Sequence, residues 1–192
     1  MISKDLSLSD RDDKSELEKI VMAGLHGTPQ IRPDEKRKYL GVFREQVLAV
    51  LSEGQVKEPA VYPEINRVLN DPRSSLLIIN GRIGETFTKK YQLLASAAKK
   101  PVKVVSGNEV SGVFGLVVAG SEAVNRDQVE IEPRRNRLNK LGVREDIIHA
   151  AGKKICKKCM NELRSKAPDE LINYQELSLL DRIMGDDCPA HQ

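Results

Sequence analysis

The sequence predicts an α/β protein: a small mixed β-sheet flanked by helices, followed by a helical C-terminal segment. A short continuous apolar run at 75–80 is typical of a strand that is covered on both faces. A helical pattern and a second apolar run follow it, and a strand–helix–strand unit of this length implies a right-handed parallel crossover. After Pro133 basic residues become frequent and strand patterns end, so we expect a boundary there.

Before the sheet, the sequence predicts a tail and three helices. We expect residues 1–14 to form a disordered tail, and the capping-box spacing at 15–18 to begin a short helix. From Asp34 to Gly54 apolar residues recur at helical spacing, which predicts a longer helix. Pro63 suits the first turn of a third helix. The apolar residues behind the pattern of the longer helix are Leu40, Phe43, Val47, Val50 and Leu51.

The predicted sheet alternates with turns and one more helix. Residues 81–84 turn the chain from the first strand into this helix, and Pro101 ends it. Further strands are predicted at 102–105, 113–119 and 129–131. The side chains expected on the inner face of the helix are Phe87, Tyr91, Leu94, Ala95 and Ala98.

Composition excludes several classes of protein. Of the 192 residues 40% are hydrophobic and 31% are charged, so the chain can bury a core. No apolar run approaches the roughly 20 residues of a membrane span. Three cysteines are too few for a secreted disulfide scaffold, so we expect a cytoplasmic protein with reduced thiols. The absence of Trp leaves little aromatic surface to stack nucleotide bases.

The net charge of +3 is unevenly distributed along the chain. Residues 134–166 contain eleven basic and three acidic side chains, a net +8, and residues 167–192 contain one basic and six acidic, a net −5. Such neighbouring blocks form either self-complementary packing or a binding surface. RNA is one partner that 134–166 would bind, through salt-dependent phosphate contacts. Another protein is the alternative partner.

The two blocks also carry the strongest chemical signal, which is Cys156-x-x-Cys159 followed by Cys188-x-x-His191. Two intervening residues let both side chains of a pair reach one ion, and two such pairs supply the four tetrahedral ligands of a structural zinc site. The 28 residues between the pairs allow an inserted helical hairpin that returns Cys188 to Cys156. The sequence therefore predicts structural zinc.

Lysines surround the first cysteine pair. Three thiolates, a neutral imidazole and Zn²⁺ sum to a charge of −1, which ammonium groups would stabilise while lowering the thiol pKa values. These lysines are also candidate nucleic-acid contacts. They are Lys153, Lys154, Lys157 and Lys158.

Two other interpretations of the cysteines stay open. The first is that their spacing arose by chance. The second is a redox pair, which usually follows a strand in a thioredoxin-like unit, and no strand is predicted before Cys156.

Catalysis has less support. The backbone of Gly81-Arg82-Ile83-Gly84 between a strand and a helix could hold a phosphate, with Gly81, Arg82 and Gly84 as contacts. The loop lacks the lysine and spacing of a P-loop, so a tight turn is favoured. His26 and His149 have no nucleophile at motif spacing. We therefore expect a non-enzymatic protein, and an enzyme acting on a small anionic ligand at 81–84 is the alternative.

Several stretches together form a recognisable combination. They are Gly27-Thr28-Pro29, Pro33-Asp34-Glu35-Lys36-Arg37 with Leu40-Gly41-Val42-Phe43-Arg44-Glu45, Leu77-Ile78-Ile79-Asn80-Gly81, Gly115-Leu116-Val117-Val118-Ala119 and Ala123-Val124-Asn125-Arg126. In this combination residues 24–132 resemble the YueI-like family of small bacterial proteins of unknown function. The resemblance implies a fold similar to the small α/β fold of chorismate-mutase-like and kink-turn-binding ribosomal proteins. It implies no activity, cofactor or catalytic residue.

We therefore expect a YueI-like α/β domain at 15–132 and a helical segment with the Cys₃His cluster at 133–192. The expected function is that of a regulatory or RNA-associated binding module with structural zinc. A protein-interaction adaptor without nucleic acid is the main alternative.

Overall fold

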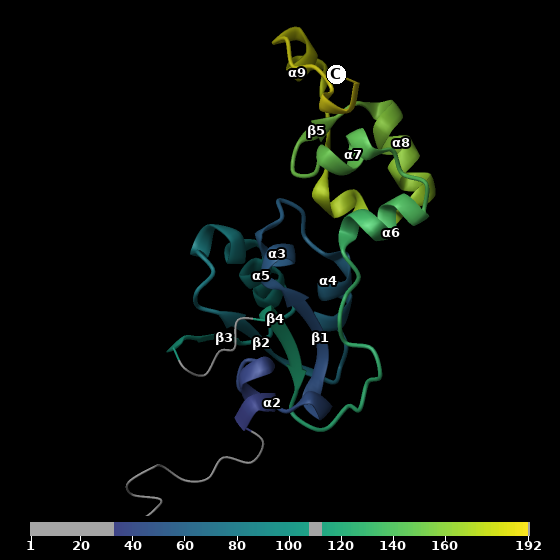
Figure 1. Ribbon diagram of the computed structural model, residues 1–192. Helices are drawn as coiled ribbons and strands as arrows, with labels where there is room; N and C mark the ends of the chain where they lie inside the picture. The colour runs from purple at the N-terminus through teal and green to yellow at the C-terminus, as the bar shows by residue number, and fades with distance from the viewer. Residues whose placement is uncertain (1–32, 108–112, 192) are drawn as a thin grey trace, which may run out of the picture. The chain divides into compact units, whose positions relative to one another are not determined.

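The computed structural model describes residues 33–107 and 113–191 of the chain. The predicted tail at 1–14 and the predicted helix that begins at Ser15 lie outside these residues. From Asp34 onward the chain belongs to one unit, which contains a mixed β-sheet and a separate hydrophobic cluster near the C-terminus (Figure 1).

The sheet of this unit has four strands in the order β1-β4-β2-β3. β4 runs antiparallel to both β1 and β2, whereas β2 and β3 are parallel. The predicted strands at 75–80, 102–105 and 113–119 and their parallel crossover are confirmed. The strands are β1 (Val47–Ser52), β2 (Ser74–Asn80), β3 (Val102–Val105) and β4 (Phe114–Gly120).

Short helices precede and flank the strands. Pro63 occupies the first turn of α4, and Gly84 is the N-cap of α5, so both of these predicted helices are confirmed. The elements are α2 (Pro33–Lys38), the 3₁₀ turn η1 (Arg44–Gln46), α3 (Glu53–Lys57), α4 (Pro63–Leu69) and α5 (Glu85–Ala97).

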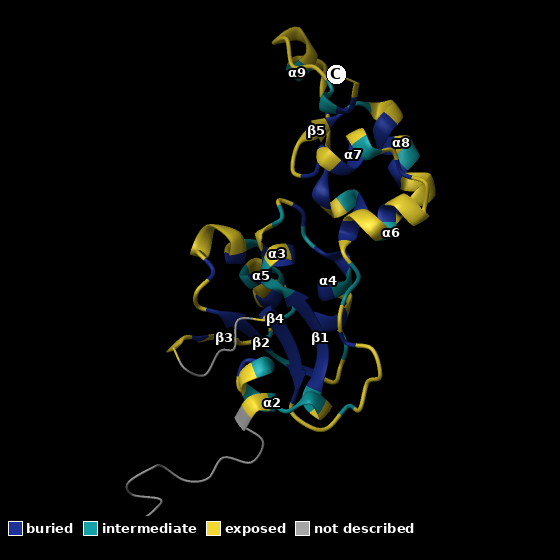
Figure 2. Ribbon diagram, in the orientation of Figure 1, coloured by how far each residue is buried: buried dark blue, intermediate teal, exposed yellow. Residues whose placement is uncertain are grey.

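The strands β1, β4 and most of β2 are buried on both faces, as Figure 2 shows by their dark colour, whereas the edge strand β3 is mostly exposed. Along β4, Leu116 and Val118 join the cluster that includes residues of α4 and α5, whereas Val117 and Ala119 join the cluster on the opposite face. This alternation follows from the two-residue period of a strand. A four-stranded mixed sheet with helices is therefore confirmed, with β3 as a largely exposed edge, while the similarity to the chorismate-mutase-like and kink-turn-binding folds stays a prediction.

The predicted helix from Asp34 to Gly54 is wrong. Leu40 adopts a positive φ of 55°, and the N–H group of Gly41 donates to the carbonyl of Lys36 at 2.7 Å, which closes α2 in the manner of a Schellman motif. The five apolar residues at 47–51 are all buried in β1. A continuous apolar run suits a strand covered on both faces, and it also contains the spacing of a helix.

Two further expectations for the α/β part need correction. On the inner face of α5, Tyr91 and Ala95 are buried, and Leu94 and Ala98 pack against the core as predicted. Phe87 does not belong to this face: it is 42% exposed at the first turn, and its neighbour Thr88 is buried. The predicted strand at 129–131 pairs with β1 only through an isolated parallel bridge from Glu130 to Val50.

After Pro133 the chain is mainly helical, but the expectation that it is entirely helical is wrong. Two short strands, β5 and β6, pair in parallel, and each has only two residues, too few to leave a period in the sequence. The elements are α6 (Arg134–Lys140), α7 (Glu145–His149), β5 (Lys154–Ile155), α8 (Lys157–Lys166), η3 (Pro168–Asn173), β6 (Gln175–Glu176), α9 (Leu179–Ile183) and η4 (Pro189–His191).

These C-terminal elements enclose their own hydrophobic cluster. Many of its members come from α6, α7, β5 and α8, and Tyr174 joins them from the end of η3. The cluster also takes in Cys159, with Cys156 and Cys188 packed against it, so the three candidate cysteine ligands are continuous with this apolar core. Other fully or nearly buried members are Leu138, Val143, Ile147, Ile155, Met160, Leu163 and Tyr174.

A buried carboxylate, that of Glu170, joins η3 to α6. Its Oε2 atom accepts hydrogen bonds from Arg134 Nε at 2.7 Å and from Asn173 Nδ2 at 2.9 Å, and its Oε1 atom pairs with Arg137. Arg134 in turn donates to the hydroxyl of Tyr174 at 2.6 Å. Since Glu170 and Arg134 are 0% and 3% exposed, each charge depends on the other for compensation.

The same network reaches the α/β part through Asn173 and Arg137. The side-chain amide of Asn173 accepts from the N–H of Val61 at 2.6 Å and donates to its carbonyl at 2.8 Å. Arg137 Nε lies 2.9 Å from Glu64 Oε1 on α4. The C-terminal elements are therefore linked to α4 and to Val61, two residues before it, by buried or half-buried polar contacts.

We expect Glu170→Gln to lower the free energy of unfolding by about 3–5 kcal/mol, because it leaves the buried Arg134 without its counter-charge. Chemical denaturation of the full chain measures this. The neighbouring Asp169→Asn is the control, since Asp169 pairs with Arg67 at 3.6 Å across an exposed surface and should cost at most about 1 kcal/mol. Equal effects of the two substitutions would contradict the role given to Glu170.

Candidate metal centre

The first cysteine pair lies where β5 leads into α8. Cys156 is the N-cap residue of α8 and Cys159 lies in its first turn. Residues at an N-cap and at the third helical position lie close together, since this is the spacing of a capping box. The helix start therefore brings both thiols to one point.

The second pair approaches this point from the end of the chain. β6 pairs with β5 in parallel, and the backbone N–H of Cys156 donates to Cys188 Sγ at 3.3 Å. The 3₁₀ turn η4 places His191 next to Cys188, with the N–H of His191 donating to the carbonyl of Cys188 at 3.0 Å. The predicted return of Cys188 to Cys156 is confirmed.

The ligand atoms of Cys156, Cys159, Cys188 and His191 all lie within 4.8 Å of one another. A tetrahedral zinc ion with ordinary bond lengths separates two sulfur atoms by about 3.8 Å, and a sulfur from a nitrogen by about 3.5 Å. Cys159 Sγ lies 3.6 Å from Cys156 Sγ and 3.9 Å from Cys188 Sγ. His191 Nε2 lies 3.5 Å from Cys156 Sγ and 3.0 Å from Cys159 Sγ. These separations suit four ligands around one ion.

The three cysteines are free thiols. A disulfide needs about 2.05 Å between its sulfur atoms, much less than the separations given above. The structure also places a two-residue strand before Cys156, where none was predicted. This strand leads into a helix without the longer parallel sheet of a thioredoxin-like unit, so it adds little to the redox interpretation.

The thiols of Cys156 and Cys159 have pKa values shifted in opposite directions. Burial, with the adjacent sulfur atoms of Cys156 and Cys188, raises the pKa of Cys159 to about 12. Burial also opposes ionisation of Cys156, but hydrogen bonds from the backbone N–H and thiol of Cys159 outweigh it and lower the pKa of Cys156. A divalent cation would supply the positive charge needed for all three thiolates to form together.

Arg144 contributes a positive charge that the sequence analysis missed. Its Nη2 atom donates to Cys159 Sγ at 3.3 Å, its Nη1 atom to the carbonyl of Ala190 at 3.4 Å, and its Nε atom to Glu162 at 3.1 Å. Arg144 thereby connects both ligand pairs from the start of α7. Because it lies twelve residues before Cys156, no local spacing could identify it.

The four lysines predicted near the first pair are all exposed. Lys154 forms an ion pair with Asp181. Lys153, Lys157 and Lys158 form no ion pair with any residue that the structure describes.

The loop at 81–84 is a tight turn whose first N–H groups are already used. Gly81 donates to the carbonyl of Val105 at 2.8 Å, Arg82 to the side chain of Asn80 at 3.0 Å, and Ile83 to the carbonyl of Asn80 at 3.1 Å. This arrangement supports the turn predicted there and leaves few donors for a phosphate. His149 is exposed and lies 3.3 Å from Glu145, and His26 lies outside the described residues.

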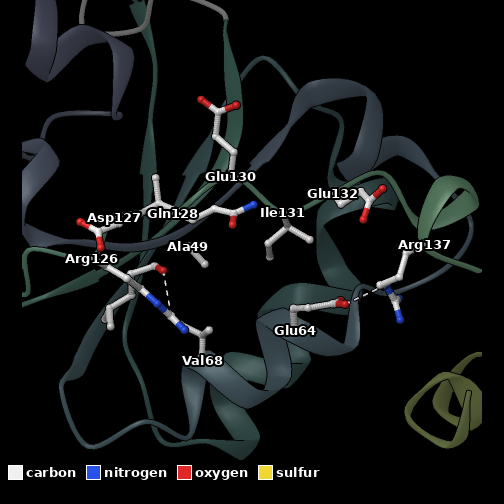
Figure 3. A pocket seen from close by; sticks show the side chains of 12 residues that line it. Ala49, Glu64, Val68, Arg126, Asp127, Gln128, Glu130, Ile131, Glu132 and Arg137 are labelled. Atoms are coloured by element: carbon white, nitrogen blue, oxygen red, sulfur yellow. Dashed lines mark hydrogen bonds and ion pairs between the residues drawn. The ribbon is translucent and has the colours of Figure 1, made fainter. Parts of the chain in front are cut away.

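A cavity of about 490 Å³ lies elsewhere, at the outer edge of β1 beside α4 (Figure 3). Its two arginines are engaged by the protein: Arg126 donates to the carbonyl of Leu48 at 3.1 Å, and Arg137 pairs with Glu64. The cavity therefore offers little to an anionic ligand. The other charged residues of its lining are acidic: Asp127, Glu130 and Glu132.

No helix among the described residues is long and apolar enough to cross a membrane.

In the reduced, metal-free protein, iodoacetamide at about pH 7.5 should alkylate Cys156 before Cys159. The lowered pKa of Cys156 leaves more thiolate at this pH, and Cys159 is fully buried with a raised pKa. Trypsin cleaves after Lys157 and Lys158, so mass spectrometry follows the two thiols in separate peptides. Equal alkylation rates would contradict the geometry, and zinc-loaded protein, in which both thiols should be protected, is the control.

Comparisons with known proteins concern the α/β part. The uncharacterised protein YueI of Bacillus subtilis (strain 168) is 32% identical over 121 residues, which cover 63% of this chain and 90% of that protein. The crystal structure of YueI from Bacillus subtilis matches with a TM-score of 0.52 and 30% identity, over 62% of this chain and 93% of that one. The predicted resemblance to YueI is confirmed.

A family described as a protein of unknown function, DUF1694, matches residues 14–130. The four candidate metal ligands lie beyond the matched residues, so the match carries no information about them. The chain belongs to the DUF1694 family of proteins of unknown function.

Proposed function

We propose that this chain is a non-enzymatic, cytoplasmic binding protein whose C-terminal segment is held together by a structural zinc ion. The observation that supports this most is the convergence of Cys156, Cys159, Cys188 and His191 within 4.8 Å of one another. The cytoplasm suits the proposal because it keeps thiols reduced and available to metal.

The donor set favours zinc in a structural role. Three thiolates and one imidazole are ligands that Zn²⁺ prefers, whereas Ca²⁺ and Mg²⁺ prefer oxygen. A catalytic zinc site keeps one position open for water or substrate, but here four protein side chains fill the tetrahedron. The ion would therefore join parts of the chain and leave no coordination position for chemistry.

The ion would connect the start of α8 to the end of the chain. Residues 160–187 form the intervening loop, and their return depends on the β5–β6 pair, the Glu170 network and the cluster itself. The C-terminal segment from Pro133 to His191 has 59 residues, and segments of this size commonly need a metal ion or another cross-link to stabilise a core. Zinc in this position would stabilise the C-terminal fold directly.

Binding to another protein is the form of binding that the charges favour. Seven of the eleven basic side chains in 134–166 form ion pairs within the protein, so the block is largely compensated. RNA binding is the second candidate because Lys153, Lys157 and Lys158 remain exposed beside the cluster. The paired residues are Arg134, Arg135, Arg137, Lys140, Arg144, Lys154 and Lys166.

Protein purified without chelator under reducing conditions should contain about one zinc ion per chain, measured by elemental analysis. Cys188→Ser and His191→Ala should lose most of this zinc and unfold at a lower temperature, because each removes a ligand. His149→Ala is the matched control, since this exposed histidine lies outside the cluster and should leave the zinc content unchanged. Wild-type protein without zinc would overturn the proposal.

For RNA, the ion pairs predict a shallow salt dependence. If only the four basic residues that form no ion pair with a described residue contact phosphates (Lys153, Lys157, Lys158 and Arg164), log K should fall with log [salt] at a slope of about −3, against about −8 for all eleven basic residues. Fluorescence anisotropy of a labelled oligouridine between about 50 and 200 mM salt measures the slope. A slope steeper than about −5 would show that the arginines leave their ion pairs for RNA and would favour the RNA-binding alternative.

A further inference from the structure

Helix α9 exposes a continuous apolar surface. Leu179, Leu180, Ile183 and Met184 are 77%, 71%, 81% and 84% exposed, and Figure 2 shows most of α9 as exposed. We call these four residues the α9 apolar face. Single exposed apolar residues are ordinary, but a contiguous group of large ones commonly marks an interaction site.

The four residues form a stripe because of their spacing. Leu179 with Ile183, and Leu180 with Met184, are each four residues apart, and side chains at this spacing are neighbours on a helix. Ile183 and Met184 directly follow the two polar residues of the helix. The sequence of residues 179–184 is therefore an apolar pair, a polar pair and a second apolar pair.

The polar side of α9 is anchored to the protein. The hydroxyl of Ser178 accepts from the N–H of Asp181 at 3.2 Å, and the Asp181 carboxylate accepts from the N–H of Ser178 at 2.8 Å, which completes a capping box. The same carboxylate pairs with Lys154 on β5. These contacts hold the helix by its polar side, so the apolar face stays outside the core.

Exposed carboxylates flank the α9 apolar face in the chain. Glu176 precedes the helix, and Asp186 and Asp187 follow it; all three are exposed, and none forms an ion pair with a described residue. Arg182 is the one basic residue of 167–192. A partner that covers α9 therefore meets apolar side chains surrounded by negative charge.

The area of the face argues against a second copy of this chain as the occupant. Even complete burial of these four residues removes only about 500–600 Å² of surface per copy, whereas a stable interface takes about 800 Å² from each partner. The acidic rims of two copies would also repel each other. A groove that surrounds the helix buries more of it, together with its flanks.

We propose that α9 docks as a helix into an apolar groove of a partner protein whose rim carries lysine or arginine. This mode of recognition reads apolar anchors at helical spacing, which is what the α9 apolar face presents. The basic rim would pair with Glu176, Asp186 and Asp187, and would speed association through charge attraction. This proposal rests on the proposed function in two respects. It takes the binding partner to be a protein, and it takes the loop 160–187, which contains α9, to be closed by a metal ion at Cys188.

The position of α9 between two anchors suits such docking. β6 precedes it and pairs with β5, while Cys188 follows it and belongs to the candidate metal cluster. A recognition helix held at both ends loses less conformational freedom on binding than a free peptide.

Site-specific photo-crosslinking of the full chain tests the proposal. A benzophenone amino acid replaces Leu180 in one variant and, as the control, Arg164 on the exposed side of α8 in another, and both are expressed in the organism that carries this protein. Proteins crosslinked from position 180 but not from 164 are identified by mass spectrometry, purified and measured for binding. We expect a partner that binds the wild-type chain at least tenfold more tightly than the Leu180→Asp/Ile183→Asp variant.

Leu180 and Ile183 are both exposed, so the double variant should keep the wild-type unfolding temperature. Circular dichroism measures this temperature. Asp186→Asn/Asp187→Asn should weaken binding about threefold at low salt and less at high salt. Equal crosslinking from both positions, crosslinks only to a second copy or to RNA, or an unchanged Kd of the double variant would each overturn the proposal.

Zinc content, measured on the same preparations, separates this proposal from the function proposed above. A protein without zinc that still crosslinks a partner from position 180 would overturn the structural metal but leave the docking helix standing. A zinc-loaded protein with no specific crosslink at that position would do the reverse.

Discussion

The C-terminal part of this protein depends on the buried carboxylate of Glu170. A buried charge must be compensated, and Glu170 meets this requirement with Arg134, Arg137 and Asn173. Because Arg137 also pairs with Glu64, and Asn173 clamps the backbone of Val61, satisfying one carboxylate fixes α6 and η3 against the α/β part. The network is more specific than an apolar contact, since its hydrogen bonds are directional and its arginines and Asn173 each need several acceptors in fixed positions.

The metal cluster and the Glu170 network complement each other along the chain. The network fixes η3 at residues 168–173, and the cluster gathers Cys156 and Cys188 on either side of it. Between the two lies a hydrophobic cluster that takes in Cys159 itself. The chain between η3 and Cys188 is therefore held at both ends, and α9 is the part of it that makes few contacts with the core.

The sequence predicted the features whose signals are local. A continuous apolar run identified β2, and two short spacings identified Cys156, Cys159, Cys188 and His191. It failed where one pattern fits two structures, as at 47–51, whose apolar residues satisfy the spacing of a helix and also fill a strand buried on both sides. It also failed where partners are distant, since Arg144 reaches Cys159 and Arg134 reaches Glu170 through the fold alone.

The basic block at 134–166 and the acidic block at 167–192 have two kinds of charged side chain: those paired with each other and those left exposed. The sequence does not distinguish the two kinds, but the fold does. Glu170 of the acidic block is buried and pairs with Arg134 of the basic block, and the half-buried Asp181 pairs with the exposed Lys154. Self-complementary packing thus accounts for these charges, as one of the two interpretations of the blocks expected. The acidic side chains that remain exposed without ion pairs gather near one short helix with four exposed apolar residues. Exposed apolar surface lowers solubility unless charge surrounds it, and the same charge selects a partner of opposite sign. The internal clamp and the proposed binding surface therefore draw on different carboxylates of one acidic block: those paired with the basic block, and those exposed beside α9.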